Sequence, residues 1–99
     1  MARPTPFATQ QAAKQMGENL RIWRTLQDLT AEQVAERAGT TRATVGRVER
    51  GEPSVGFEVV LNVARALGIL DSLVVATDPY ETQLGRARAD ERLPRRVRR

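Results

Sequence analysis

The sequence of 99 residues lacks cysteine and histidine altogether. Their absence excludes disulfides, thiol nucleophiles, the common kinds of zinc site and the usual proton shuttle at neutral pH. No apolar run approaches the roughly 20 residues that a membrane helix needs, and the first residues, "MARPTPFATQ", have no apolar segment typical of a secretory signal. We therefore expect a cytoplasmic protein that is not an enzyme, needs no metal or cofactor and does not act at a membrane.

Positive charge is in excess, and almost all of it comes from arginine. Lysine and arginine together number 16 against 12 acidic residues, which gives a net charge of +4, and Lys14 is the only lysine. Arginine suits bidentate recognition of phosphates and guanine edges better than lysine does, although genome composition can produce the same bias. The excess of arginine is therefore a weak indication of nucleic-acid binding.

The N-terminal third predicts an arm followed by a long helix. Residues 1–8 contain two prolines and show no periodicity, which is typical of a flexible arm. From residue 9 to about residue 27, apolar residues recur at steps of three and four, as on an amphipathic helix. We expect Trp23, the only tryptophan, to anchor the core. The apolar stripe consists of Ala12, Ala13, Met16, Leu20, Trp23 and Leu26.

The segment "LTAEQVAERAG" carries the start and stop signals of a short helix. Thr30 stands at the N-cap position, and Gln33 follows three residues later, which is the spacing of a capping box. Gly39 suits the left-handed backbone of a helix C-terminus. The sequence therefore predicts a helix between Thr30 and Gly39.

A second short helix is predicted immediately afterwards, from residue 42 to residue 50. Its apolar residues Val45 and Val48 should face the core, and Gly51 stops it. Because only about three residues join this helix to the preceding one, the two should cross at a steep angle.

The remaining sequence predicts two more helices and a tail. "EPSVGFEVVLNVARALG" and "ILDSLVVA" have apolar residues at helical spacing, and although valines would also suit a strand, the length and rhythm favour helices. Residues 78–99 hold seven arginines and four acidic residues, so three units of the net charge lie there. The prediction is an all-α protein with a flexible arm (residues 1–8), a five-helix domain (9–77) and a basic C-terminal tail (78–99).

From Met16 to Leu73 the sequence resembles the Xre-type family of repressors, above all in "LTAEQVAERAGTTRATVGRVERG". The resemblance implies a compact five-helix helix-turn-helix domain that binds double-stranded DNA as a homodimer on an inverted-repeat operator, with residues 42–50 in the major groove. The residues expected to contact bases are Thr41, Arg42, Ala43, Thr44 and Arg47. Those expected to contact the DNA backbone are Thr30, Gln33, Thr40, Arg50 and Ser54.

Some residues in and around this motif have simpler roles or depart from the family pattern. Arg37 and Arg65 are better explained as a solvated helix face, and Thr41 can serve as an N-cap whether or not it touches DNA. Ala31 stands at the first position of the second helix, where the family often has glutamine. The side-chain contact of that glutamine with DNA is missing here, so the operator's outer positions are less defined.

The resemblance also implies an ion pair, and an excess of apolar residues at the end of the predicted domain indicates a dimer surface. Arg24 and Glu49 match an arginine late in the first helix and a glutamate late in the third that pair in the family. Loss of one partner of a buried pair costs about 3–5 kcal/mol. The expected dimer interface consists of Leu70, Leu73, Val74 and Val75, although these residues could instead complete the core of the monomer.

The segment "DPYETQLGRARADE" resembles the HipB-like branch of the same family, which comprises antitoxins encoded beside HipA-like kinase toxins. This resemblance implies a protein that represses its own operon and binds a HipA-like kinase toxin away from the recognition helix. The alternative is a stand-alone Xre-type repressor without a toxin partner. The arginine-rich end "RRVRR" can also be a plain basic extension that favours phosphates.

Overall fold

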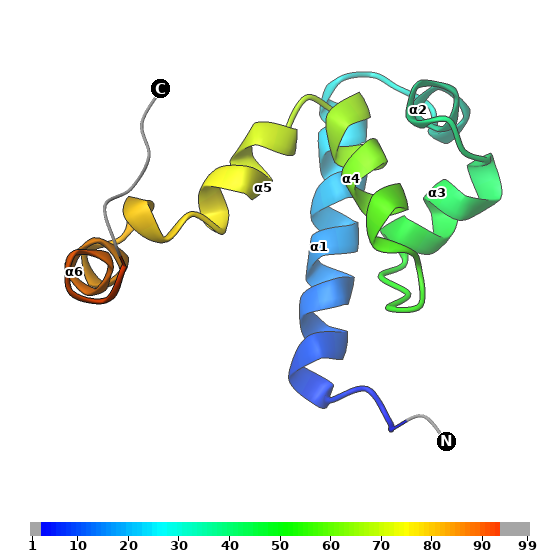
Figure 1. The fold of residues 1–99 in the computed structure, drawn as a ribbon. Helices are drawn as coiled ribbons and strands as arrows, with labels where there is room; N and C mark the ends of the chain where they lie inside the picture. The colour runs from blue at the N-terminus through cyan, green and yellow to red at the C-terminus, as the bar shows by residue number, and fades with distance from the viewer. Residues whose placement is uncertain (1–2, 94–99) are drawn as a thin grey trace.

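The computed structural model describes residues 3–93, which form helices joined by short turns (Figure 1). Within this range the protein has no strand, and it has six α-helices where the sequence predicts five. The elements are α1 (Phe7–Leu26), α2 (Ala31–Ala38), α3 (Arg42–Glu49), α4 (Phe57–Ala66), α5 (Leu70–Ala76), the 3-10 turn η1 (Pro79–Glu81) and α6 (Gln83–Arg92).

The additional helix, α6, lies in the segment expected to be a tail. Thr82 caps it, because the hydroxyl oxygen of Thr82 accepts a hydrogen bond from the backbone N–H of Gly85 at 2.9 Å, and the helix packs against η1. Most of its residues are good helix formers, but few are apolar, so no stripe marks it in the sequence. At the other end, α1 begins at Phe7, inside the segment expected to be an arm.

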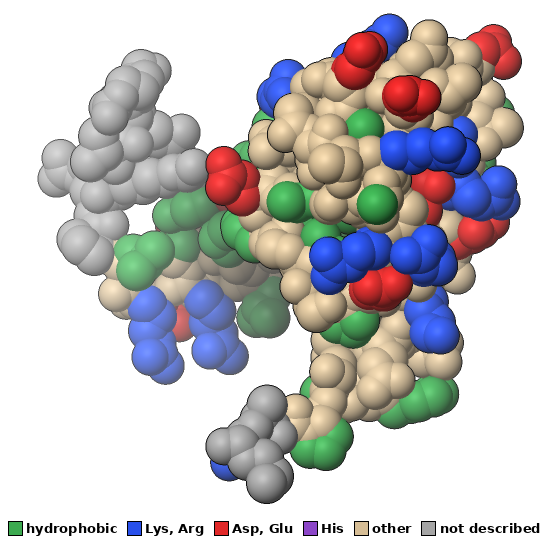
Figure 2. Space-filling view, turned by 90° about the vertical axis from the view of Figure 1, so that its right-hand side faces the viewer, with side chains coloured by type: hydrophobic (Ala, Val, Ile, Leu, Met, Phe, Trp, Pro, Cys, Tyr) green, Lys and Arg blue, Asp and Glu red, His purple; other side chains and the backbone are tan. Residues whose placement is uncertain are grey.

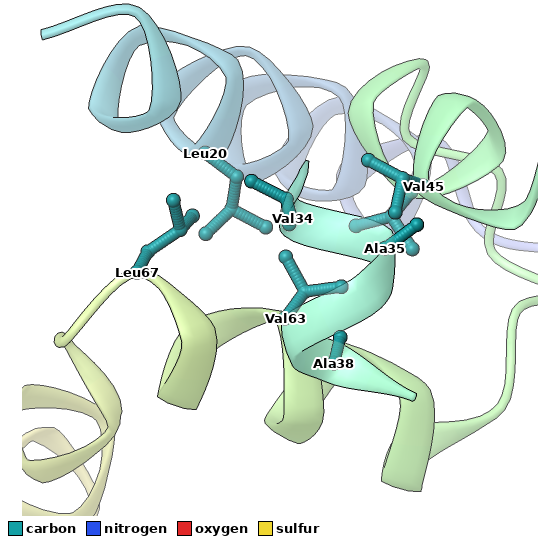
Figure 3. Close-up of a cluster of buried hydrophobic side chains, with 8 residues drawn as sticks. Leu20, Val34, Ala35, Ala38, Val45, Val63 and Leu67 are labelled. Carbon is teal, nitrogen blue, oxygen red and sulfur yellow. The ribbon is translucent and has the colours of Figure 1, made fainter. Parts of the chain in front are cut away.

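The core lies where α1, α2, α3 and α4 meet, and it is built from small aliphatic side chains (Figure 3). α2 is central, because it packs against both α3 and α4 while α1 packs against α3. Burying a valine or leucine side chain stabilises a fold by about 1.5–3 kcal/mol. The buried cluster consists of Leu20, Val34, Ala35, Ala38, Val45, Val48, Val63 and Leu67.

Glycines with positive φ follow both α2 and α3. Gly39 has φ +70° at the end of α2, and the three residues 39–41 suffice to turn the chain into α3. Gly51 has φ +72° after α3, and a Cβ at this position would lie 2.5 Å from the carbonyl oxygen of Ala13. Glycine is needed at residue 51 both for its backbone conformation and for the close approach of α1.

Trp23 does not anchor the core, contrary to the sequence prediction, since 44% of its surface is exposed. Leu20 is the only member of the predicted stripe that is buried. α1 is 20 residues long, and its N-terminal end extends beyond the other helices (Figure 1). Trp23 instead borders a hollow between α1, α4 and α5, together with Met16 and Leu73.

The C-terminal part of the described chain extends away from the core as an arm formed by α5, η1 and α6 (Figure 1). α5 buries none of its residues, and α6 buries only Ala89. Val74, Val75 and Leu84 are exposed along this arm. No helix among residues 3–93 is both long enough and apolar enough to span a membrane.

Candidate nucleic-acid interface

The outer face of α3 is lined by arginines and by residues with little or no side chain. Because Val45 and Val48 are buried, and successive residues turn by about 100°, the opposite side of the helix faces outward. This side and the first residue of α2 enclose an open hollow. Figure 2 views the molecule from the side of α2 and α3 and shows several basic side chains there, with acidic side chains between them. The hollow is lined by Ala31, Arg42, Ala43, Gly46, Arg47 and Arg50.

The start of α3 is fixed by two threonines. The hydroxyl oxygen of Thr41 accepts a hydrogen bond from the backbone N–H of Thr44 at 3.1 Å, and the Thr41 hydroxyl donates to Thr44 Oγ1 at 2.9 Å. Thr41 is therefore the N-cap of α3, and it is exposed beside Arg42 and Ala43. The cap holds the first turn of α3 in place at the edge of the hollow.

The start of α2 is held by the capping box that the sequence predicts. Gln33 N donates to the hydroxyl oxygen of Thr30 at 3.0 Å, and the backbone N–H of Thr30 donates to Gln33 Oε1 at 2.9 Å. Because this box occupies Oε1, the amide nitrogen of Gln33 is the group left to contact a ligand. Ala31 lies in the hollow, where a larger side chain would occupy space in front of α3.

Arg47 and Arg50 are not independent, because a single carboxylate, Glu52, holds both. Arg47 Nε donates to Glu52 Oε1 at 3.1 Å, and Arg50 Nε donates to Glu52 Oε2 at 3.2 Å. Arg47 Nη2 also donates to the hydroxyl oxygen of Ser54 at 3.2 Å. The hydrogen bond from Arg47, reinforced by that from Arg50, lowers the pKa of Glu52 against a smaller opposing effect of desolvation.

Glu52 is a site residue that sequence reasoning missed. The sequence did offer one indication of its role. Glu52 directly follows Gly51, the glycine that ends the helix, and a turn at such a glycine can bring the next side chain back beside that helix. In the structure the backbone N–H of Glu52 donates to the carbonyl of Arg47 at 3.1 Å, which brings the carboxylate beside the arginines of α3.

Arg24 and Glu49 form the bidentate pair that joins α1 to α3. Arg24 Nε lies 2.7 Å from Glu49 Oε2, and Arg24 Nη2 lies 3.2 Å from Glu49 Oε1. Arg24 Nη1 also donates to the carbonyl of Leu29 at 3.1 Å. The two side chains are only 19% and 11% exposed, so the pair is largely shielded from water.

The remaining predicted residues lie outside the hollow. Arg65 Nη2 donates to the carbonyl of Arg37 at 2.9 Å, so Arg65 ties α4 to α2. Ser54 is exposed in the turn after α3, and Thr40 is half-buried in the turn before it. The four residues expected at a dimer interface lie on α5, where Leu70 and Leu73 are half-buried and Val74 and Val75 are exposed.

Two further observations concern possible ligands of this chain. Within residues 3–93, no group of three or more acidic side chains is placed so that it could hold a metal ion. The arginines of "RRVRR" fall outside the described residues, so their expected contact with phosphates stays a prediction from the sequence.

Comparison with known proteins places the same region in a family. The family described as Helix-turn-helix domain matches residues 15–76, which include all of α2 and α3. Control protein C.SmaI of Serratia marcescens is 38% identical over 52 residues, which are 52% of this chain and 62% of that relative. The match therefore covers less than two thirds of the relative. No solved structure matches the chain.

Proposed function

The chain belongs to the helix-turn-helix domain family, and from that membership we propose that it is a DNA-binding transcriptional regulator that represses the promoter it binds. The observation that carries the proposal is the hollow on the outer face of α3, where Arg42, Arg47 and Arg50 surround Ala43 and Gly46. The similarity to a protein named as a control protein supports a regulatory role. The HipB-like branch has no such support.

The composition of the outer face of α3 suits the major groove. Ala43 and Gly46 add almost no bulk, so base edges can approach the helix closely, while arginines reach the groove on either side. Arg42 is exposed and makes no hydrogen bond or ion pair within residues 3–93, so its whole guanidinium is available to DNA. We propose that Arg42 and Arg47 each bind the N7 and O6 atoms of a guanine, a contact worth about 1–3 kcal/mol of discrimination.

Contacts with the DNA backbone complete the proposed interface. The exposed residues Thr30, Gln33 and Ser54 lie at turns and helix starts that flank α3, where side chains and free backbone N–H groups can donate to phosphates. Thr41 and Thr44, at the first turn of α3, would contact bases at the edge of the hollow. Thr40 and Arg50 complete the proposed phosphate contacts.

We also propose that the protein binds DNA as a homodimer through α5. Val74 and Val75 expose 61% and 50% of their surface, and the half-exposed Trp23 borders the hollow between α1 and α5, which Leu73 of α5 also lines. Apolar surface of this kind favours association. With the two α3 helices separated by roughly 34 Å, one turn of DNA, the operator would be an inverted repeat.

A second candidate function is that of an antitoxin for a HipA-like kinase. Its support is the arm of α5, η1 and α6, which presents exposed Val74, Val75 and Leu84 away from α3 and could bind a protein while α3 binds DNA (Figure 1). Co-expression with a HipA-like kinase distinguishes the two candidates, because only an antitoxin forms a stable complex with the kinase and suppresses its toxicity.

The proposed function is tested by selecting duplexes that bind the protein from a random DNA pool and by measuring the affinity for the selected duplex. Replacement of Arg42 by alanine should weaken this binding about 5- to 150-fold, as expected for loss of a bidentate guanine contact. Arg88→Ala, which removes the same charge from exposed α6, is the matched control and should change it far less. Failure of the wild type to enrich any sequence, or equal effects of both substitutions, would overturn the proposal.

A further inference from the structure

We propose that Glu52 is a positioning residue that sets the sequence specificity of α3 by bracing Arg47 and Arg50. This inference rests on the proposed DNA-binding function and deepens it. Glu52 would not contact bases itself. Its carboxylate would hold both guanidinium groups in fixed directions, so that Arg47 presents its donors to one arrangement of base acceptors while Arg50 is directed at a phosphate.

The geometry of Arg47 shows how such bracing leaves the base-reading edge open. Nε of Arg47 donates to Glu52, and Nη2 donates to the hydroxyl oxygen of Ser54. A guanidinium has five N–H donors, so three remain, one on Nη2 and two on Nη1. One N–H of Nη1 and the remaining N–H of Nη2 form the end of the fork, the edge that can bind N7 and O6 of a guanine together.

The brace serves two arginines because each oxygen of the carboxylate has its own partner. Oε1 of Glu52 accepts from Arg47, while Oε2 accepts from Arg50 Nε at 3.2 Å and also lies 3.2 Å from Arg50 Nη2. The side chains remain 41% exposed at Arg47 and 64% exposed at Arg50. Arg42, in contrast, lines the same hollow without any such partner among the described residues.

Backbone hydrogen bonds hold the turn after α3, and they fix where Glu52 stands relative to this helix. After α3, Gly51 N donates to the carbonyl of Val48 at 2.9 Å, and Glu52 N donates to the carbonyl of Arg47 at 3.1 Å. Gly51 is buried against α1, where it leaves no room for a Cβ. The turn therefore cannot move away from α3 without breaking the contact between α1 and the end of α3.

The charge of Glu52 should act on DNA in two opposite ways. A carboxylate within a Debye length of the phosphates, about 10 Å at 0.1 M salt, repels the DNA backbone and weakens binding to every sequence. Holding Arg47 and Arg50 in one geometry, however, reduces the rotamer freedom that Arg47 would otherwise lose on binding the right bases and that Arg50 would lose on binding a phosphate. Glu52 should therefore lower affinity for arbitrary DNA while raising the preference for the selected sequence.

Three variants separate these effects, with affinities measured for the wild-type-selected duplex and for a shuffled duplex of the same composition. Glu52→Gln removes the charge, and we expect it to bind the shuffled duplex a few-fold more tightly while the ratio of the two affinities falls about tenfold. Glu52→Asp keeps the charge but is one methylene too short to span both arginines, so the ratio should fall while the affinity for shuffled DNA stays unchanged. Glu81→Gln, the same charge change on η1, should alter neither.

A measurement without DNA checks the brace directly. The Nε–H resonance of Arg47, assigned by its loss in Arg47→Lys, should be protected from solvent exchange in the wild type and unprotected in Glu52→Gln and Glu52→Asp. Melting temperatures of the variants show whether they fold, and the half-exposed position of Glu52 leaves the core intact in both.

The outcomes distinguish this inference from the proposed function. If the wild type enriches no sequence from the pool, the proposed function fails. If it enriches a sequence, but folded Glu52→Gln and Glu52→Asp keep the wild-type affinity ratio, the role of Glu52 is overturned while DNA binding stands. An unprotected Arg47 Nε–H in the wild type overturns it as well. A lower ratio in both variants, with unchanged behaviour of Glu81→Gln, supports it.

Discussion

Replacing Glu49 by alanine should destabilise the fold far more than its place on α3, near the proposed DNA-binding face, suggests. Arg24 and Glu49 are joined by two hydrogen bonds of 2.7 and 3.2 Å and are largely shielded from water. Breaking a buried pair by removing one partner costs about 3–5 kcal/mol, because the remaining charge is left without compensation. Arg24 keeps its hydrogen bond to the carbonyl of Leu29 and some contact with water, so we expect the lower end of this range, about 3 kcal/mol.

The assay is thermal unfolding followed by circular dichroism, with urea unfolding as a second measurement. For a domain of this size, about 3 kcal/mol corresponds to a fall in Tm of roughly 12–24 °C. The chain offers a matched control in Glu18 and Arg21, which also lie 2.7 Å apart but have side chains that are both 47% exposed. Glu18→Ala should shift Tm only slightly, because exposed pairs are weakened by solvent and by side-chain entropy.

A double variant separates loss of the pair from loss of packing. In Arg24→Met/Glu49→Leu no charge is left buried, so most of the lost stability should return. DNA binding by Glu49→Ala should recover when the temperature is lowered well below its Tm, because Glu49 faces Arg24 and does not line the hollow of α3. A Tm for Glu49→Ala equal to that of the wild type would refute the reasoning about this largely shielded pair.

Two further predictions concern the acid behaviour of Glu52 and the state of association. Hydrogen bonds from Arg47 and then Arg50 lower the pKa of Glu52 in the folded protein, so its bracing contacts should persist through the pH range in which an ordinary glutamate is protonated and be lost only at lower pH. A carbon-13 NMR titration midpoint at or above that of an ordinary glutamate would contradict this. Val74→Glu on α5 should convert the proposed dimer to a monomer in analytical ultracentrifugation. Leu84→Glu changes a similarly exposed apolar residue on α6 and should leave the dimer intact. A monomeric wild type would show that α5 is not a dimer surface.

The parts of the fold that sequence reasoning predicted are those fixed by neighbouring residues. The capping box of Thr30 and Gln33 and the turn at Gly39 depend on spacing of three residues or on one backbone conformation. Val45 and Val48 are buried because a helix following that turn can pack against α2 on only one side. Features that depend only on neighbouring residues in this way can be predicted from the sequence.

The features that the sequence did not predict depend on which helices meet in space. The spacing of apolar residues along the chain does not contain this information. The stripe on α1 shows that one face is apolar but not how far the neighbouring helices extend along it, so the pattern predicts Trp23 in the core although it lies at the edge. α6 has no apolar stripe to reveal it, because Thr82 and η1 stabilise it instead. Glu52 belongs to the candidate interface only because a turn of the chain folds it back onto α3.

The half-exposed position of Trp23 also provides a built-in fluorescent probe. It is the only tryptophan, so the emission excited selectively from tryptophan comes from one known point on α1, which lines the same hollow as Leu73 of α5. An indole in contact with water changes its emission little when the chain unfolds, but that emission shifts to shorter wavelengths when another surface covers it. Intrinsic fluorescence of this protein should therefore report what docks between α1 and α5, and it should be a poor measure of the integrity of the valine and alanine core.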